Sequence, residues 1–240
     1  MAEEEPKLAS WRWAAGGFYA FISVAFTIYL IVLLIAQPLF PFQSENVDWG
    51  MSWLLLAVVD YYHMAACFCG IVIATESRLA AIIWCLLTCF LGAPFACLYT
   101  AKQIGFASSL TLRENYEVVR SIYAVSKPEK PLQGFVGYIV AAIYLLAGSA
   151  FGARLVWTLT TYSLAEIGSA DAEWAFEWFF TTVLDYYTIA LCLIGIVLST
   201  EDTCPGLAWV AGMVFITGPA GSAWMAQRIF RERPLALESA

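Results

Sequence analysis

The sequence predicts an all-α integral membrane protein with six transmembrane helices arranged as two three-helix repeats. Of its 240 residues, 61% are hydrophobic and 13% are charged, whereas soluble domains have about 45–50% apolar and about 25% charged residues. The charges separate long apolar stretches, most of which reach the roughly 20 residues that a spanning helix needs. These stretches are continuously apolar and lack the alternation of barrel strands.

The positions of the charges define the six expected spans. They cover 17–39, 52–75, 79–99, a stretch within 134–163, 178–200 and 204–227. Asp60 and Asp185 interrupt the second and fifth spans, and Arg154 lies inside the fourth. The acidic start of the chain is unlike a secretory signal or a transit peptide, so we expect the first span to be a retained signal anchor.

A polar linker separates two apolar parts of the chain. The predicted domains are a first repeat at 1–100, a linker at 101–133 and a second repeat at 134–240. Within the linker, residues 111–125 place Leu112, Tyr116 and Val119 on one helical face and charged residues on the other. This pattern is typical of an amphipathic helix that lies in the membrane interface.

The two apolar parts resemble each other at a fixed offset of 125 residues. Residues 59–77 and 184–202 match at ten of 19 positions, which include an Asp-Tyr-Tyr triplet and a Thr-Glu pair. At the same offset Trp53 meets Trp178, and Pro94 meets Pro219. Chance similarity between apolar segments does not reproduce Asp, Trp and Pro in one ungapped register, so the pattern indicates an internal duplication.

Three spans per repeat predict that the two repeats have opposite orientations. An odd number of crossings takes the chain to the other side, so the second repeat starts there and a pseudo-twofold axis lies in the membrane plane. In this topology the positive-inside rule gives almost no preference for either orientation of the protein in the membrane, because six Lys and Arg residues lie on one side and five on the other. Parallel repeats would require the charged linker to cross the membrane, which is unfavourable.

Composition and motifs exclude several classes of function. The net charge of −7 argues against binding to nucleic acid. A single histidine, His63, excludes a multi-histidine metal or haem site within one chain. The seven cysteines form no Cys-x-x-Cys pair, and no nucleophile or phosphate-binding motif is present. We therefore expect no enzymatic activity, no metal ion and no cofactor.

Asp60 and Asp185 are the first candidates for a functional site. A charged carboxylate inside a span costs a few kcal/mol unless it is paired or protonated. In inverted repeats both approach the midplane, where they could bind a cation or relay a proton; the alternative is a structural role in helix packing. Arg154 is either the counter-charge of one aspartate or a side chain that reaches the headgroups.

Tyrosines and glutamates repeat together with the aspartates. Tyr61 and Tyr186 could donate to a carboxylate or to a polar substrate, or serve helix packing. Glu76 and Glu201 end the second and fifth spans, and inverted repeats would place them at opposite surfaces as a symmetrical pair of entrances.

His63 lies on the same helical face as Asp60, three residues further on, and the second repeat has Thr188 in its place. It is a candidate proton-relay partner, a candidate axial ligand of a chlorophyll-type pigment, or a packing residue.

A family resemblance rests on the stretch from Trp53 through Asp60-Tyr61-Tyr62 and Thr75-Glu76-Ser77 to Trp84, Gly92 and Tyr99. It resembles an uncharacterised plant and algal family of multi-pass membrane proteins, a domain of unknown function. The sequence departs from the family pattern where Ala93-Pro94 follows Gly92, at a place where a small hydroxyl residue is expected. The resemblance implies a plant or algal kind of membrane protein and brings no established activity, cofactor or catalytic residue.

The first functional hypothesis is a carrier or channel for a small solute or ion that uses Asp60 and Asp185. A second is a non-catalytic subunit or assembly factor of a larger membrane complex, such as a photosynthetic one. A third is a membrane enzyme or thiol protein that uses Cys67 or Cys192. The expected partners are the lipid bilayer and either a second copy of the chain or a membrane complex.

Overall fold

The structure, a computed structural model, describes residues 5–39, 48–107, 110–112, 135–163, 173–231, 233 and 235–238. These residues form helices joined by short turns, together with one antiparallel bridge between Leu112 and Leu237. Most of the amphipathic helix expected at 111–125, including its polar face, lies outside the described residues.

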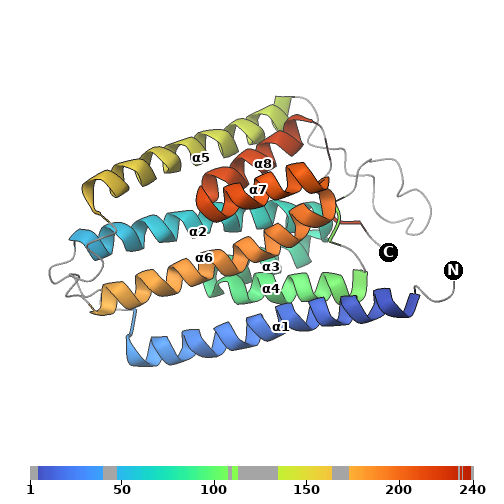
Figure 1. Cartoon of the computed structure of the whole chain (residues 1–240), viewed down its shortest axis with the longest axis horizontal. Helices are drawn as coiled ribbons and strands as arrows, with labels where there is room; N and C mark the ends of the chain where they lie inside the picture. The colour runs from blue at the N-terminus through green and yellow to red at the C-terminus, as the bar shows by residue number, and fades with distance from the viewer. Residues whose placement is uncertain are drawn as a thin grey trace.

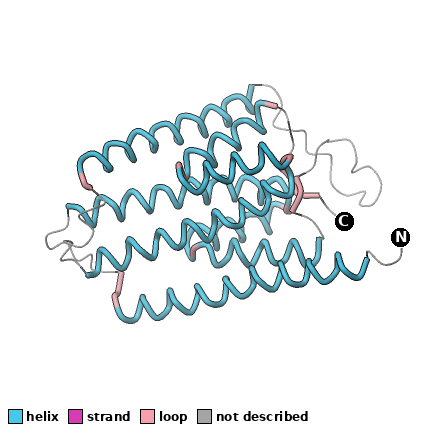
Figure 2. The backbone as a smooth tube through the Cα atoms, viewed as in Figure 1, coloured by secondary structure: helices cyan, strands magenta, loops and turns pink. Residues whose placement is uncertain are grey.

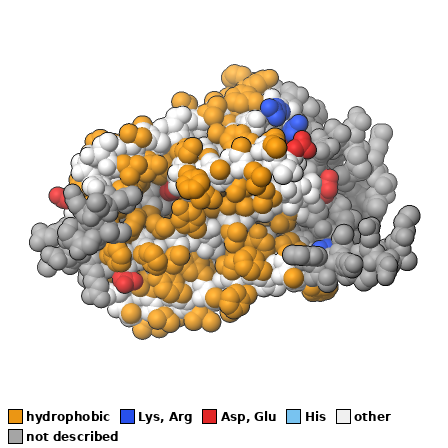
Figure 3. Space-filling model, in the orientation of Figure 1, with side chains coloured by type: hydrophobic (Ala, Val, Ile, Leu, Met, Phe, Trp, Pro, Cys, Tyr) orange, Lys and Arg blue, Asp and Glu red, His pale blue; other side chains and the backbone are white. Residues whose placement is uncertain are grey.

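Four helices are long and apolar enough to cross a membrane: α1 (Glu5–Ala36), α2 (Asp48–Thr75), α5 (Phe135–Thr161) and α6 (Glu173–Thr200). They contain 27 to 32 residues, more than the roughly 20 that a span requires. They run along the long axis of the molecule (Figure 1). The face seen in Figure 3 is broadly apolar between ends where most of the visible charged side chains gather.

The expected third and sixth spans are each divided into two short helices. The third consists of α3 (Arg78–Leu91) and α4 (Ala93–Lys102), which continues into a short π-helix, η1 (Gln103–Ala107). The sixth consists of α7 (Thr203–Phe215) and α8 (Gly218–Phe230). At 1.5 Å per residue these helices are about 15–21 Å long. Each is too short to cross a bilayer, so six membrane-length helices are not present among the described residues.

Each pair of short helices forms a hairpin that returns to its starting end. α3 begins directly after the end of α2, and Lys102, at the end of α4, contacts Glu76 at that same place. The turn between the two helices instead contacts Asp185 near the middle of α6. The hairpin therefore reaches only halfway along the long helices, as the tube shows (Figure 2) at the place where Figure 1 labels α3 and α4 in the same view.

The central helices α2 and α6 run in the same direction, so the expected inverted arrangement is wrong. Near their first residues, the rings of Trp49 and Phe179 lie 5.9 Å apart. Near their last residues, Thr75 and Thr200 each bind one residue of the Leu112–Leu237 bridge. The physical reason is parity, because each unit contains two full-length helices and one returning hairpin, which adds no crossing.

The core lies between α2 and α6, with α1 and α5 on opposite flanks (Figure 1). Met64, Cys67 and Phe68 of α2 and Ile189 and Leu193 of α6 are fully buried there. Large apolar side chains are exposed on the outer helices, among them Phe21, Ile35, Phe135 and Leu146. So broad an exposed apolar surface is typical of contact with lipid or with another protein.

Candidate functional site

The two aspartates lie at the tips of the two hairpins, each binding the hairpin of the other half of the chain. The Oδ1 atom of Asp185 accepts a hydrogen bond from the Ala93 backbone N–H, with a distance of 2.7 Å. The Oδ1 atom of Asp60 accepts one from the Gly218 backbone N–H, also at 2.7 Å. Each aspartate thus provides an N-terminal cap for α4 or α8 from a distant part of the sequence.

The residue before each of these helices makes no side-chain cap, so a distant carboxylate can take that place. The first N–H groups of a helix have no partner within the helix, and Gly92, which precedes α4, has no side chain to offer. The positive end of the helix dipole also favours an anionic partner. Pro94 and Pro219 stand at the second position of α4 and α8, where a missing N–H costs nothing.

The turn before α4 is too narrow for a side chain. Gly92 has a φ of +90°, in a region that other residues rarely adopt. A Cβ atom added there would lie 3.0 Å from Oδ1 of Asp185. The corresponding turn contains Thr217 with a φ of +68°, the one non-glycine residue with positive φ among those that the structure describes.

The tyrosine that follows each aspartate binds the first helix of a hairpin, α3 or α7. The Tyr61 hydroxyl donates to the Thr88 carbonyl at 2.5 Å, and the Tyr186 hydroxyl donates to the Met213 carbonyl at 2.6 Å. Both carbonyls lie close to the end of the first helix of a hairpin. Each tip is therefore held by a tyrosine from one central helix and an aspartate from the other.

Glu76 and Glu201 lie at the same end of the molecule, so the expected entrances on opposite surfaces are not present. Their positions follow from the parallel course of α2 and α6. Glu76 accepts hydrogen bonds from Lys102 at 2.6 Å and Gln103 at 2.8 Å. Glu201 accepts hydrogen bonds from Arg228 and from the indole N–H of Trp224, both at 3.1 Å. Each glutamate anchors the returning helix of its own hairpin.

Thr75 and Thr200, which precede these glutamates, bind the bridge between Leu112 and Leu237, here called the clasp. The sequence did not predict this contact. The Leu112 N–H donates to Thr200 Oγ1, and the Leu237 N–H donates to Thr75 Oγ1, both at 3.0 Å. Leu112 and Leu237 are themselves paired in the antiparallel bridge and almost fully buried. Their separation is again 125 residues, which is the signal that would have found them.

Arg154 makes no described ion pair with either aspartate. The ion pairs among the described residues join Glu76 to Lys102 and Glu201 to Arg228 and Arg233. The Arg154 guanidinium instead lies over the Trp157 ring, 4.0 Å from its centroid. Arg154 is therefore not the counter-charge of either aspartate in this structure.

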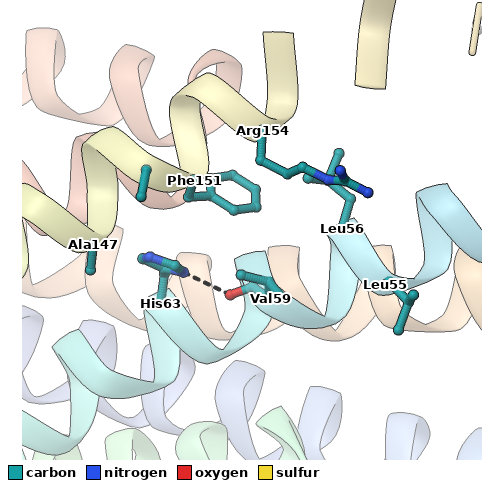
Figure 4. Close-up of a pocket in the computed structure, with 8 residues that line it drawn as sticks. Leu55, Leu56, Val59, His63, Ala147, Phe151 and Arg154 are labelled. Carbon is teal, nitrogen blue, oxygen red and sulfur yellow. Dashed lines mark hydrogen bonds between the residues drawn. The ribbon is translucent and has the colours of Figure 1, made fainter. Parts of the chain in front are cut away.

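His63 lies beside an apolar cavity between α2 and α5 (Figure 4). Its Nδ1–H donates to the Val59 carbonyl at 2.8 Å, since a carbonyl can only accept. Its Nε2 atom is buried and has no hydrogen-bond partner among the described residues. The ring also packs against Phe151, with centroids 5.1 Å apart.

The two cysteines proposed as thiol candidates are buried in the core. Cys192 and Cys97 have their sulfur atoms 3.5 Å apart, and both are free thiols. Cys67 is also fully buried. Within the described part of the chain, no group of three or more His, Cys, Asp or Glu side chains is arranged to hold a metal ion.

Comparisons of the chain with protein-family models, with curated proteins and with solved structures give no match. The resemblance to a plant and algal family therefore stays a prediction, and the functional argument rests on the geometry of this chain.

Proposed function

We propose that the protein crosses a membrane four times, through α1, α2, α5 and α6, and carries two re-entrant hairpins, α3–α4 and α7–α8. Its halves are parallel and related by a pseudo-twofold axis along the membrane normal. The bounds of α2 and α6 differ by 125 residues at both ends, in support of this arrangement. Non-helical or broken segments at membrane depth are tolerated where protein covers them, which suits hairpins packed on α2 and α6.

Reciprocal hydrogen bonds between the halves support the same symmetry. Tyr19 donates to the Leu191 carbonyl, and its counterpart Tyr144 donates to the Ala66 carbonyl. Near the other end, the indoles of Trp53 and Trp178 likewise donate across the halves, to the carbonyls of Tyr162 and Gln37. In every case both donor and acceptor are shifted by 125 residues, as a twofold relation requires.

Charge gives this topology a definite orientation. The described residues next to both termini and to the linker lie at one end (Figure 1). In the four-crossing topology, 11 of the 12 Lys and Arg residues belong to that side of the membrane, Arg154 being the exception. The connections at the opposite end, 37–47 and 162–172, contain no Lys or Arg. The positive-inside rule then places the termini on the cytoplasmic side, or its equivalent in an organelle.

Within this topology the protein is a carrier or channel for a small cation. A carboxylate near the middle of a span is costly and marks ion pathways, and paired broken helices in two halves mark binding sites in transporters. The single observation that carries this function is the contact of each mid-helix carboxylate with the N-terminus of a half-length helix. Movement of a hairpin tip would free the carboxylate to bind a proton or metal cation.

The test is cation flux into liposomes that contain the purified protein. Proton, sodium and potassium uptake are followed with fluorescent indicators for the wild type and for Asp60→Asn with Asp185→Asn. Asparagine keeps an oxygen that accepts the Ala93 or Gly218 N–H and removes only the charge, so the fold is expected to remain while flux falls at least tenfold. Asp202→Asn, at an exposed position, is the matched control. Wild-type liposomes without flux of any of these ions, or full flux in the double variant, would contradict the proposal.

A second candidate is a non-catalytic subunit of a larger membrane complex. The observation in its favour is the tight packing of α2 against α6, where the side chains of the core leave little exposed surface. Large apolar side chains on α1 and α5 are available for partner contacts. Purification in a mild detergent discriminates, because a subunit elutes with partner proteins or a coloured complex and a carrier does not need them.

A further inference from the structure

The cavity between α2 and α5 has the shape and chemistry of a binding groove. Its volume is about 370 Å³. Two sides are apolar, with Leu55, Leu56 and Val59 on α2 and alanines and Phe151 on α5. The polar residues at its ends are His63 and Arg154, whose side chain extends from α5 past Leu56 (Figure 4).

The equivalent place in the other half of the molecule is bridged by a hydrogen bond. At the 125-residue offset, Tyr29 corresponds to Arg154 and Thr181 corresponds to Leu56. The hydroxyls of Tyr29 and Thr181 are hydrogen-bonded at 3.0 Å, which joins α1 to α6. Phe26 stacks on the Tyr29 ring from the same helix. The α2–α5 side has lost this hydrogen bond and gained a cation, so the groove is a specific feature of one half.

Arg154 is placed to meet an anionic head group. It lies seven residues before the last residue of α5, about 10 Å along the helix axis. In a spanning α5 this is within reach of the membrane interface for a long side chain. Its guanidinium lies on the exposed Trp157 ring and forms none of the described ion pairs. Among the described residues it is also the one Lys or Arg outside the charged end of the molecule.

We propose that this groove binds an anionic phospholipid, with its phosphate on Arg154 and one acyl chain between α2 and α5. A guanidinium binds phosphate oxygens through two parallel hydrogen bonds. The aliphatic side chains and Phe151 supply apolar contact for the chain, which ends against the His63 ring. This lipid site is independent of the proposed cation flux.

Native mass spectrometry of lipid complexes tests the site. The purified protein is titrated with phosphatidylglycerol and with phosphatidylcholine of the same acyl chains. Both lipids have a phosphate, but the choline cation of phosphatidylcholine cancels the charge of its head group and repels the guanidinium. We therefore expect one phosphatidylglycerol to bind at least about tenfold more tightly than phosphatidylcholine. Arg154→Gln is expected to abolish this preference, and Arg78→Gln, a change at an exposed arginine of the charged end, is expected to keep it.

A second variant tests the groove without changing charge. Ala150 lies on the wall of the groove and is exposed, so Ala150→Phe fills the space and should not disturb the core. We expect it to weaken phosphatidylglycerol binding at least about fivefold while Arg154 remains. Equal binding of the two lipids, an unchanged preference in Arg154→Gln, or wild-type binding in Ala150→Phe would each overturn the proposal. Melting temperatures confirm that the variants are folded.

Discussion

At the scale of single residues, Asp60 and Asp185 show what sequence can and cannot predict. A carboxylate in an apolar helix stands out because burial of a charge is costly, and both aspartates were identified on that ground. Their partners were not, since the N–H groups of Gly218 and Ala93 are backbone atoms more than 90 residues away. Backbone donors leave no trace in side-chain composition. Among side chains, Arg154 is the natural counter-charge, but it lies over the Trp157 ring instead.

The capping role predicts different effects for two substitutions of Asp185. Asp185→Ala leaves the Ala93 N–H without its acceptor, and we expect a loss of about 1–3 kcal/mol in the free energy of unfolding. Asp185→Asn retains an acceptor and should lose less than half of that. Unfolding in mixed micelles measures both, with Asp202→Ala as the control. Equal losses in the alanine and asparagine variants would show that the charge, and not the hydrogen bond, stabilises the tip.

At the scale of elements, two hairpins stand where the sequence predicts continuous third and sixth spans. Residues 79–101 carry no charge, which is equally true of one continuous span and of a hairpin buried to half depth. Gly92 and Pro94 marked the interruption, but a kink and a full reversal place the same residue types at the turn. What separates them is the contact of α4's last residues with Glu76 beside the start of α3. That contact is tertiary and has no periodicity in the sequence.

The two glutamate anchors are expected to differ in strength. Arg228 and Glu201 have side chains that are 3% and 9% exposed, whereas Lys102 and Glu76 are 37% and 16% exposed. Removing one partner of a buried ion pair leaves an uncompensated charge and lowers the free energy of unfolding by about 3–5 kcal/mol. A solvated ion pair contributes only about 0–1 kcal/mol to that free energy. We therefore expect Glu201→Ala to lower the free energy of unfolding far more than Glu76→Ala. Similar losses for the two variants would contradict this ranking.

At the scale of the whole molecule, the helical class and the apolar character were accessible from sequence. The relative direction of the halves was not, because it depends on whether an uncharged segment crosses or returns. Counting the hairpins as spans divided the Lys and Arg residues six to five. Counting them as returning segments gathers 11 at one end. The turn at Gly92 thus decides whether the two halves have the same or opposite directions.

Cysteine labelling distinguishes the two topologies. In a background without other cysteines, native Cys204, which is exposed at the start of α7, serves as one reporter. A reporter at Ser126→Cys in the linker and one at Ser44→Cys between α1 and α2 complete the set. Four crossings predict that Cys204 and the linker label from the side of the N-terminus and that Ser44→Cys labels from the other. Labelling of Cys204 and the linker from the side of Ser44→Cys would restore the six-span interpretation.

The exchanged contacts at the hairpin tips bear on how such a chain could arise. Each half supplies the cap for the other's hairpin, and each contributes one residue to the bridge between Leu112 and Leu237. Two separate copies of a half-length chain, inserted in the same direction, could satisfy all of these bonds by symmetry. An even number of crossings returns each copy's last residue to the side where the next begins. A tandem fusion of such copies would need no reversal of membrane insertion, only a connecting segment.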